Sequence, residues 1–462
     1  MKIMRTTPKS IIKKIRRGEY KVCVVGLGRV GLPTACLLAK AKARVVGVDK
    51  NLKNLKIISE GKSPFEEKGL QPLLEKVVRD GKLTVSSNLR QEASKCDVII
   101  ILVSTLIDSN KNPDYSQVEN VCKDLGLSLQ EDSLVIMGST VGPGFTENVA
   151  AKIIEKHSGF KAGEEFGLAY SPVRASPGRI LRDLQSYPRV IAGINKGSTV
   201  RACSVLSLMV KGGFVVMDSI KAAETVKVFE NVYRDVNIAL ANVLANFCEE
   251  VGLNYKKIAE AANTQPFCHL HRPGIVGGTC IPVTPYFLIS EAEGLGLDLN
   301  FVRMAREVNE KVADRVSKNI LKALEKEGIR AKKAKILILG FSYKANSKGE
   351  YLTPCMALTE ILRRKGVEIS VWDPLYTSAE IKEFGYVPAD FDETLRNVDC
   401  VVISVGHSIF KKLKKKILED LNMKTKKTLV FDVSGYNIFT PDDSTGKVKC
   451  MSIGFTHHEK QE

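Results

Sequence analysis

Short apolar runs alternate with helical stretches from residue 21 to about residue 215. Glycine, proline, serine or charged residues bound each run, and the stretches between runs place apolar residues at helical intervals. This alternation is typical of βαβ units and therefore of a parallel sheet. The expected strands lie in KVCVVGLG, RVVGVD, DVIIILVS, SLVIMGST, FGLAYSP and PRVIAG.

One long helical period follows, SIKAAETVKVFENVYRDVNIALANVLANFCEEV, over residues 219–251, with no glycine or proline inside it. A helix of this length reaches about 50 Å, enough to bridge two domains or to pair with a copy of itself. The strand-helix rhythm then resumes with KILILGFSYK, EISVWDP, DCVVISVG and TLVFDVSG. We therefore predict an α/β protein with two Rossmann-like, doubly wound domains, residues 1–215 and 326–462, joined by a helical middle domain, residues 216–325.

Composition narrows the class of protein. Of 462 residues, 44% are hydrophobic and 26% charged, as in soluble globular proteins. The longest apolar run, Val98 to Val103, is too short to span a membrane. The basic first 20 residues lack the apolar segment of a secretory signal, so a short surface helix is expected there. The eleven cysteines stand singly with no C-x-x-C pair, which favours reduced thiols and a cytoplasmic location.

The net charge of +17 fits nucleic acid, a phosphate-bearing ligand or simple solubility. The one dense basic run, FKKLKKK at residues 410–416, has no interleaved aromatic residues, so a solvated face is favoured over nucleic-acid binding. The segment CHLHR at residues 268–272 has no second pair of ligands at zinc spacing, so no metal site is expected.

A dinucleotide fingerprint opens the first domain. Gly26, Gly28 and Gly31 form G-x-G-x-x-G between a strand and a helix, and Asp49 ends the next strand. In this pattern the glycines allow a tight turn, an approach to pyrophosphate and close packing of helix and strand. The acid accepts hydrogen bonds from ribose hydroxyls and repels a 2′-phosphate, so the sequence predicts NAD rather than NADP.

The second Rossmann-like domain has a weaker turn, GFSYKAN, with only Gly340 in place of a full fingerprint. It is consistent with a nucleotide held through this turn and Lys344, and equally with a structural domain that holds no ligand.

Two further segments carry polar residues where ligands commonly bind. Ser139 and Thr140 follow the strand SLVIM, at the carboxyl end of a parallel strand. Lys227 and Asn231 are four residues apart and therefore share one face of the long helix. If that helix lines a cleft, the pair provides an oxyanion contact and a water ligand; otherwise the two are ordinary half-exposed polar residues.

A lone thiol, Cys280, lies in GIVGGTCIPVTPYF. Gly277 and Gly278 allow a ligand close to the chain, and the prolines after the cysteine stiffen the far side. A single cysteine is more often a small buried apolar residue. The flanking residues make a nucleophile an equal alternative.

Six segments together resemble the nucleotide-sugar 6-dehydrogenases, the family of UDP-glucose, GDP-mannose and UDP-N-acetylhexosamine dehydrogenases. They are GLGRVGLP, GSTVGPGFTE, YSPVRASPG, AAETVKVFENVYRDVNIALANVLA, GGTCIPVTPYFL and GFSYKAN, in the family's order over nearly the whole chain. GIVGGTCIPVTPYFL and SVGHSIFKK look nearer to the UDP-N-acetylmannosamine and UDP-N-acetylglucosamine branch than to the UDP-glucose branch.

The resemblance implies two NAD-dependent oxidations at C6 of a UDP-sugar, alcohol to aldehyde to acid, through a cysteine thiohemiacetal and thioester. It implies catalytic roles for Cys280, Lys227, Asn231 and Thr140. It also implies a homodimer built on the middle domain and a place in polysaccharide synthesis. The remaining contacts it implies are Gly26, Gly28, Val30, Gly31, Asp49, Thr105 and Ser139 with the cofactor, and Arg174, Gly277, Gly278, Tyr343 and Lys344 with the substrate.

The chain departs from the family's pattern at four positions. Val173, Thr279, Thr284 and Tyr351 stand where the family usually has Glu, His, Asp and Arg, and the loop PGIVGG is one residue shorter. Two carboxylates usually credited with proton handling are therefore missing. Three hypotheses follow: an active UDP-N-acetylhexosamine or UDP-glucose dehydrogenase, a weakened paralogue that binds NAD and sugar nucleotide, and a single-step dehydrogenase of the hydroxyacid type. Cys280, Lys227, Asn231 and Thr140 occur together, which favours the first.

Overall fold

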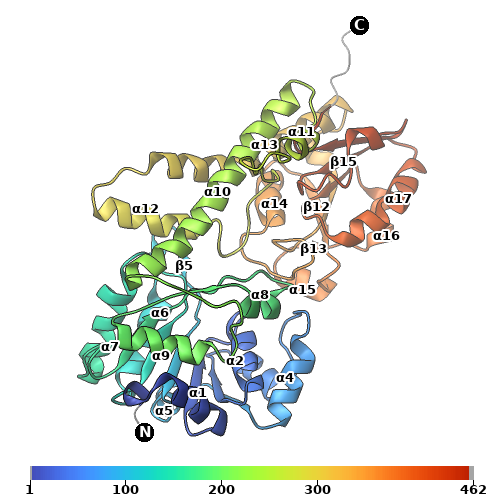
Figure 1. Cartoon of the computed structure of the whole chain (residues 1–462). Coiled ribbons are helices and arrows are strands. Elements are labelled where there is room, and N and C mark those ends of the chain that lie inside the picture. Colours follow the sequence, from blue (N-terminus) through green and yellow to red (C-terminus); the bar gives the residue numbers. More distant parts are fainter. Residues whose placement is uncertain (1–2, 457–462) are drawn as a thin grey trace. The chain divides into compact units, whose positions relative to one another are not determined.

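The protein is described by a computed structural model over residues 3–456 (Figure 1). The chain forms two compact units, Met1–Glu230 with Tyr286–Asp298 and Asn231–Pro285 with Leu299–Glu462. The boundary falls within one continuous helix, α10 (Ile220–Glu250), so the first unit contains its start and the second unit the rest.

An eight-stranded sheet forms the centre of the first unit, in the order β10-β9-β8-β7-β4-β1-β2-β3. Neighbouring strands are parallel except β8 and β9, which run antiparallel. The chain turns from β1 towards β2 and β3 on one side and returns to β4 on the other, which creates a switch point at the carboxyl ends of β1 and β4. The strands are β1 (Lys21–Val25), β2 (Arg44–Val48), β3 (Leu83–Ser86), β4 (Val98–Ile101), β7 (Leu134–Met137), β8 (Gly167–Tyr170), β9 (Arg189–Gly193) and β10 (Phe214–Val216).

Helices cover both faces of this sheet, which explains why its central strands are apolar at consecutive positions. One face packs against α1 (Pro8–Arg17), α2 (Gly31–Lys40), α3 (Leu52–Ser59), α4 (Leu70–Arg79), α8 (Ile180–Ser186) and α9 (Lys196–Leu206). The other packs against α5 (Leu89–Ala93), α6 (Ser116–Gly126), α7 (Ala151–Ser158) and the start of α10. Smaller elements are η1 (Ile3–Arg5), η2 (Thr146–Ala150) and the antiparallel pair β5 (Leu106–Ile107) and β6 (Pro113–Asp114).

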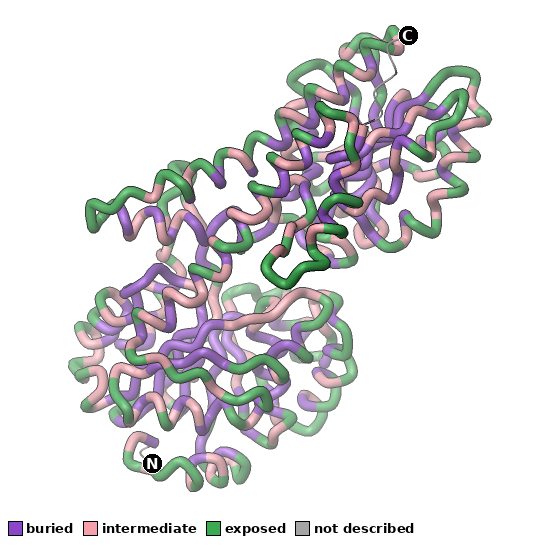
Figure 2. The backbone as a smooth tube through the Cα atoms, turned by 45° about the horizontal axis from the view of Figure 1, so that its top comes forward, coloured by how far each residue is buried: buried purple, intermediate pink, exposed green. Residues whose placement is uncertain are grey.

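The second unit holds a six-stranded, wholly parallel sheet in the order β13-β12-β11-β14-β15-β16. This is the doubly wound order, with its own switch point between β11 and β14. Its strands are β11 (Lys335–Leu339), β12 (Glu368–Trp372), β13 (Val387–Pro388), β14 (Cys400–Ile403), β15 (Thr428–Asp432) and β16 (Val448–Ser452). In both units the strands are mostly buried, while the outward helix faces are exposed (Figure 2).

Two layers of helices flank the second sheet as well. One face carries α13 (Asn300–Lys326), α14 (Pro354–Arg364) and α15 (Ser378–Glu383), and the other α16 (Phe391–Asn397) and α17 (Ser408–Asn422). The remaining elements are α11 (Tyr255–Ala262), α12 (Thr284–Gly294), η3 (Ala331–Lys333) and η4 (Pro441–Asp443).

Buried polar side chains join α10 to α13 within the second unit. Asp235 of α10 is fully buried and pairs with Arg306 of α13, which is itself 2% exposed. Asn309 donates from Nδ2 to the Asp235 carboxylate at 2.8 Å. Removing either partner of a buried ion pair is destabilising, because the remaining charge would lie unpaired in a low-dielectric interior. These bonds fix the register of the two helices.

The predicted fold class is confirmed: two α/β sheets, parallel apart from the β8–β9 pair, and a helical middle with one long helix. The helix expected at residues 219–251 is α10, Ile220–Glu250. The short helix expected near the start is α1, Pro8–Arg17; residues 1 and 2 lie outside the described part of the chain.

Candidate active site

The predicted dinucleotide turn lines a pocket of about 470 Å³ at the carboxyl ends of β1, β2 and β4. This is the switch point of the first sheet, where open α/β sheets bind their ligands. Of the predicted cofactor residues, Gly26, Gly28 and Asp49 line it directly. Wall residues beyond the predicted ones are Lys50, Asn51, Asn54, Ser87, Leu89, Leu102, Val103, Ser104, Gln117, Asn120, Val121 and Asp124.

The glycines of the turn differ in what a side chain would meet. A Cβ on Gly31 would lie 1.7 Å from the carbonyl oxygen of Gly26, so only glycine lets α2 start against β1. A Cβ on Gly28 would meet no atom within 4 Å. Gly28 therefore leaves open space at the start of a helix, as a pyrophosphate requires.

Asp49 is held in place by the turn that it faces. Its Oδ2 accepts the Leu27 N–H at 2.7 Å and its Oδ1 accepts the Asn51 N–H at 2.9 Å. The carboxylate remains half-exposed on the pocket wall and retains lone pairs for ribose hydroxyls. A dinucleotide without a 2′-phosphate fits this arrangement, because Gly28 leaves room for the pyrophosphate and Asp49 offers a fixed carboxylate to the ribose.

Two other predicted cofactor residues, Thr105 and Ser139, brace the surroundings of this pocket. Thr105 donates its hydroxyl to the Thr140 carbonyl at 2.5 Å, and Ser139 donates to the Val103 carbonyl at 2.7 Å. These bonds tie the segment after β4 to the segment after β7. Val30 is the residue before the first turn of α2.

Glu224, which sequence patterns did not reveal, anchors the loop that carries Thr140. It is fully buried on α10. Its two carboxylate oxygens accept the Gly144 N–H at 2.5 Å and the Thr146 N–H at 2.8 Å. The Gly142 N–H donates to the Tyr115 hydroxyl at 2.9 Å. Burial raises the pKa of Glu224 to about 7, since desolvation outweighs the hydrogen bonds from Thr146 and Gly144 that lower it.

Lys227 and Arg174 also belong to the first unit. Lys227 is half-buried on α10, one turn after Glu224. Arg174 is held by Glu230, with 2.8 Å between Nε and the carboxylate, and donates to the Pro188 carbonyl at 3.1 Å. Val173 contributes to the apolar core beside it, so no carboxylate lies at that position.

The cysteine loop lies in the second unit, and Cys280 is exposed. The Cys280 carbonyl accepts the Thr284 N–H at 2.9 Å, which places the cysteine one turn before the N-terminus of α12. The Thr279 hydroxyl is 3.8 Å from the sulfur.

The predicted substrate residues of the second unit pack against this loop. Gly278 has φ of +90°, and a Cβ there would lie 2.5 Å from the Tyr343 ring. Its N–H donates to the Tyr351 carbonyl at 3.0 Å. A Cβ on Gly277 would lie 2.4 Å from the Leu352 carbonyl oxygen. The two glycines thus let segment 277–280 lie against segment 343–352, while Lys344 is exposed on the latter.

Asn231 and Thr284 form a buried pair in the same unit. Asn231 donates from Nδ2 to the Thr284 hydroxyl oxygen at 3.0 Å, and both side chains are less than 5% exposed. Thr284 thus provides a neutral acceptor at the position where the resemblance implied an aspartate. The bond fixes the Asn231 amide and leaves its Oδ1 available to a further donor.

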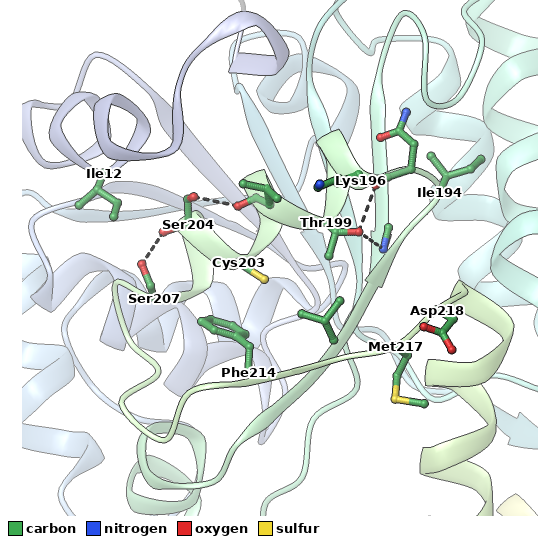
Figure 3. A pocket seen from close by; sticks show the side chains of 14 residues that line it. Ile12, Ile194, Lys196, Thr199, Cys203, Ser204, Ser207, Phe214, Met217 and Asp218 are labelled. Carbon is green, nitrogen blue, oxygen red and sulfur yellow. Dashed lines mark hydrogen bonds between the residues drawn. The ribbon is translucent and has the colours of Figure 1, made fainter.

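A larger pocket, of about 630 Å³, lies elsewhere in the first unit, among α1, α9 and β10 (Figure 3). Its walls include Ile12, Ile194, Cys203, Phe214 and Met217. The hydroxyls of Thr199, Ser204 and Ser207 donate to nearby backbone carbonyls. Among the described residues, none of the predicted site residues lines this pocket.

Three family models match successive parts of the chain. They describe the NAD binding domain, the central domain and the UDP binding domain of the UDP-glucose/GDP-mannose dehydrogenase family, at residues 20–207, 221–311 and 337–441. The chain therefore belongs to this family, and it is an NAD-dependent oxidoreductase of the UDP-sugar 6-dehydrogenase class.

Individual relatives agree with this assignment. The chain is 34% identical over 425 residues to the UDP-N-acetyl-D-mannosamine dehydrogenase of Methanococcus maripaludis, with 90% of this chain and 94% of that protein covered. It is 30% identical to the UDP-N-acetyl-D-glucosamine 6-dehydrogenase of Salmonella typhi, with 86% and 92% covered. The solved UDP-D-ManNAc dehydrogenase of Pyrococcus horikoshii superposes with a TM-score of 0.86 at 31% identity, covering 94% of this chain and 99% of that one.

Over residues 3–456, no helix has the length and apolar character needed to cross a membrane. The same residues contain no cluster of three or more His, Cys, Asp or Glu side chains suited to a metal ion.

Replacing Gly28 and Gly31 separately tests the cofactor site. Gly28→Ala is expected to lower NAD affinity about 10-fold with little change in melting temperature, because its methyl group enters open space meant for pyrophosphate. Gly31→Ala is expected to lower the melting temperature itself, since its methyl group collides with the Gly26 carbonyl. Calorimetric titration with NAD and thermal melts measure both. NAD affinity of Gly28→Ala within about 2-fold of the unmodified chain would contradict this site.

Replacing Glu224 by Gln tests whether the pKa of this buried carboxyl is raised. Its pKa is raised from 4.5 in the unfolded chain to about 7 when folded, so the folded state binds more protons between these values. Stability from this group is therefore present at low pH and declines as pH rises towards 7. The melting temperature of the unmodified chain, relative to Glu224→Gln, is expected to fall by roughly 2–6 °C between pH 5 and pH 7 and to stay level above pH 8. A difference in melting temperature that does not change with pH would contradict a raised pKa for Glu224.

Proposed function

We propose that this enzyme oxidises a UDP-N-acetylhexosamine, with UDP-N-acetylmannosamine as the favoured substrate, to the corresponding uronate. The observation that carries the proposal is the exposed Cys280, held one turn before α12 and packed through Gly278 on Tyr343 of the UDP binding domain. The relatives named for UDP-N-acetylmannosamine and UDP-N-acetylglucosamine support the choice of sugar.

Cys280 is proposed to hold the carbon between the two oxidations. NAD held at the pocket of Gly26, Gly28 and Asp49 would supply the oxidation, taking two hydrides per sugar as C6 passes from alcohol to acid. At the aldehyde level the Cys280 thiolate adds to C6, forming a C–S bond and a thiohemiacetal. At the acid level the same sulfur carries a thioester. Water then attacks C6, the C–S bond breaks, and the carboxylate leaves with the sulfur again a thiolate.

Three polar residues are proposed to act on oxygen atoms around that carbon. Lys227 stabilises the developing oxyanion, and its loss is expected to cost about 100-fold in turnover. Thr140 and Asn231 hold the substrate oxygen or the attacking water. Thr284 fixes the Asn231 amide through a hydrogen bond, which supports a water held by neutral groups where the resemblance implied a carboxylate.

The UDP portion is proposed to bind the second unit through Tyr343 and Lys344, and the sugar to bind through Arg174, Gly277 and Gly278. Arg174 is held by Glu230, which favours a fixed position for its guanidinium. For the cofactor we propose contacts from Val30, Thr105 and Ser139 in addition to the residues that line the pocket.

A second candidate function is a weakened paralogue that binds both ligands and turns over slowly. The specific observation in its favour is that Val173 contributes to an apolar core and Thr284 replaces an acid, so neither position supplies a base. UDP-glucose is the alternative substrate.

Counting NADH per sugar while Cys280 is replaced tests the proposal. The unmodified enzyme should form two NADH per UDP-N-acetylhexosamine, and Cys280→Ser at most one, with no uronate, because a serine cannot support the thioester stage. Cys268→Ser, a half-buried thiol in the same unit, serves as the matched control and should leave the count at two.

Mass spectrometry of the product checks the same experiment. Uronate formed at an unchanged rate by Cys280→Ser would remove this thiol from the mechanism. One NADH per sugar in the unmodified enzyme would support a single-step dehydrogenase. Binding of NAD and sugar nucleotide without NADH formation would support the weakened paralogue. A faster reaction with UDP-glucose would replace the proposed sugar.

We also propose a three-domain organisation over residues 1–215, 216–325 and 326–462, a cytoplasmic location and a role in polysaccharide synthesis. All eleven cysteines are free thiols, which supports a reducing compartment.

The proposed homodimer rests on an exposed apolar stripe in the second unit. On α10 the residues Tyr233, Leu240, Val243 and Phe247 are between 46% and 59% exposed, and Val251, directly after the helix, is 46% exposed; on α13 Phe301 and Met304 are 71% and 62% exposed. Contiguous apolar surface of this kind usually marks an interface. A second copy pairing along α10 would bury it.

Two glutamates on that stripe test the dimer. Val243→Glu with Phe247→Glu should convert a particle of twice the 50.8 kDa chain mass into one of single mass, as measured by light scattering, because two buried carboxylates oppose pairing. Met423→Glu, at another exposed apolar residue, is the control and should remain dimeric. A monomeric unmodified chain at micromolar concentration would contradict the dimer.

A further inference from the structure

A buried polar cluster lies beneath the turn GFSYKAN, at the switch point of the second sheet. Asp373, at the carboxyl end of β12, is fully buried. Its Oδ2 accepts the Phe341 N–H at 2.6 Å, the Ser342 N–H at 2.8 Å and the Ser342 hydroxyl at 3.0 Å. This carboxylate fixes the first half of the turn to the end of the neighbouring strand.

His407, between β14 and α17, joins the other half of the turn to the same carboxylate. It is 1% exposed. Its Nε2 lies 3.1 Å from Asp373 Oδ2, and its Nδ1 lies 3.0 Å from the backbone nitrogen of Asn346. A backbone N–H can only donate, so Nδ1 must accept it. The proton of the neutral ring is therefore on Nε2 and is donated to Asp373.

Asn346 closes the turn from the opposite side. Its φ is +55°, a left-handed conformation that asparagine tolerates better than most residues. Its side-chain Oδ1 accepts the N–H and the hydroxyl of Ser408, each at 3.0 Å. The ends of segment 341–346 are thus bound to the body of the unit, and Tyr343 and Lys344 lie between those anchors.

The cluster has a structural rather than a nucleophilic arrangement. Ser342 donates to Asp373 and not to His407, so the imidazole does not activate the hydroxyl as it does in a catalytic triad. In addition, both ring nitrogens of His407 are occupied, one by a donor and one by an acceptor. The remaining role for the imidazole is to join two parts of the protein.

We propose that His407 is a positioning residue for UDP: by accepting the Asn346 N–H through Nδ1, it holds segment 341–346 in the shape that presents Tyr343 and Lys344 to the nucleotide. The inference rests on the proposed function, in which these two residues bind UDP. The turn also bears on the cysteine loop, since the Tyr343 ring lies against Gly278. A turn that loses its anchor at Asn346 therefore weakens UDP binding first and misplaces the cysteine loop second.

Replacing His407 by Asn or by Gln keeps one of the two hydrogen bonds of the ring and removes the other. Asparagine places its carbonyl oxygen near the position of Nδ1 and can still accept the Asn346 N–H. Glutamine places its amide near the position of Nε2 and can still donate to Asp373, but it leaves the Asn346 N–H without an acceptor. The hydrogen bond from the Asn346 N–H is partly buried, so leaving this N–H without an acceptor carries a cost and the two variants are expected to differ.

Calorimetric titration with UDP at pH 8, on the full-length protein, gives the decisive comparison. His407→Asn is expected to bind UDP within about 3-fold of the unmodified chain, and His407→Gln about 10-fold more weakly. NAD affinity is the internal control, because the NAD pocket belongs to the first unit, and it should not change in either variant. Equal losses, the reverse order or no loss in either variant would overturn the role of His407.

The unmodified protein provides a second measurement that does not depend on how the variants fold. Long-range ¹H–¹⁵N correlation spectra of protein labelled at histidine report which ring nitrogen carries the proton. An Nε2–H tautomer for His407 at pH 8 is expected, and an Nδ1–H tautomer would overturn the inference. If the unmodified chain fails to bind UDP, the proposed function itself fails, whereas UDP binding that is indifferent to position 407 removes only the present inference.

Discussion

The buried polar face of α10 is the constraint on which the site depends. Glu224, Asn231, Asp235, Asn242 and Glu249 follow one another at intervals of seven, four, seven and seven residues, which places them along one side of the helix. Each is at most 9% exposed. Because an unsatisfied buried polar group costs about 1–3 kcal/mol, each one requires a particular partner at a particular place.

For Glu224, Asn231 and Asn242 the partners include segments beside the predicted site residues, whereas Asp235 and Glu249 pair with Arg306 and Arg315 of α13. In the first unit, Glu224 accepts two N–H groups of the segment that follows Thr140. In the second unit, Asn231 holds Thr284, and Asn242 accepts the Gly274 N–H at 2.7 Å. A loop alone would have many conformations, whereas a loop bonded to a rigid helix has few. Within each unit, α10 therefore limits the conformations of the segments that lie beside the predicted site residues, while its opposite, apolar side is exposed.

Features that depend on neighbouring residues could be predicted from the sequence, and features that depend on distant ones could not. The glycine turn, Asp49 and the long helix follow from local spacing, and the structure shows the expected pocket at that turn. Glu224 gives no such signal, because the amides it binds are about 80 residues away and any buried glutamate looks the same in sequence. Arg174 was predicted as a substrate contact, yet its partner Glu230 lies on another element and became visible only in the fold.

The two Rossmann-like sheets show how one scaffold yields two kinds of site. In each, an aspartate ends the second strand and accepts an N–H of the first turn: Asp49 from Leu27 at 2.7 Å, and Asp373 from Phe341 at 2.6 Å. Asp49 remains half-exposed on a pocket wall, so it can accept ribose hydroxyls.

Asp373 is fully buried, and Oδ2 alone takes bonds from Phe341, Ser342 and His407, while Oδ1 accepts the Leu375 N–H at 2.8 Å. Because the carboxylate is buried beneath the turn, the lone pair that Oδ1 retains is out of reach of a ribose. In the second sheet the aspartate therefore stabilises the turn instead of contacting a dinucleotide. A nucleotide bound there must be recognised by the residues that this turn displays rather than by the acid beneath it.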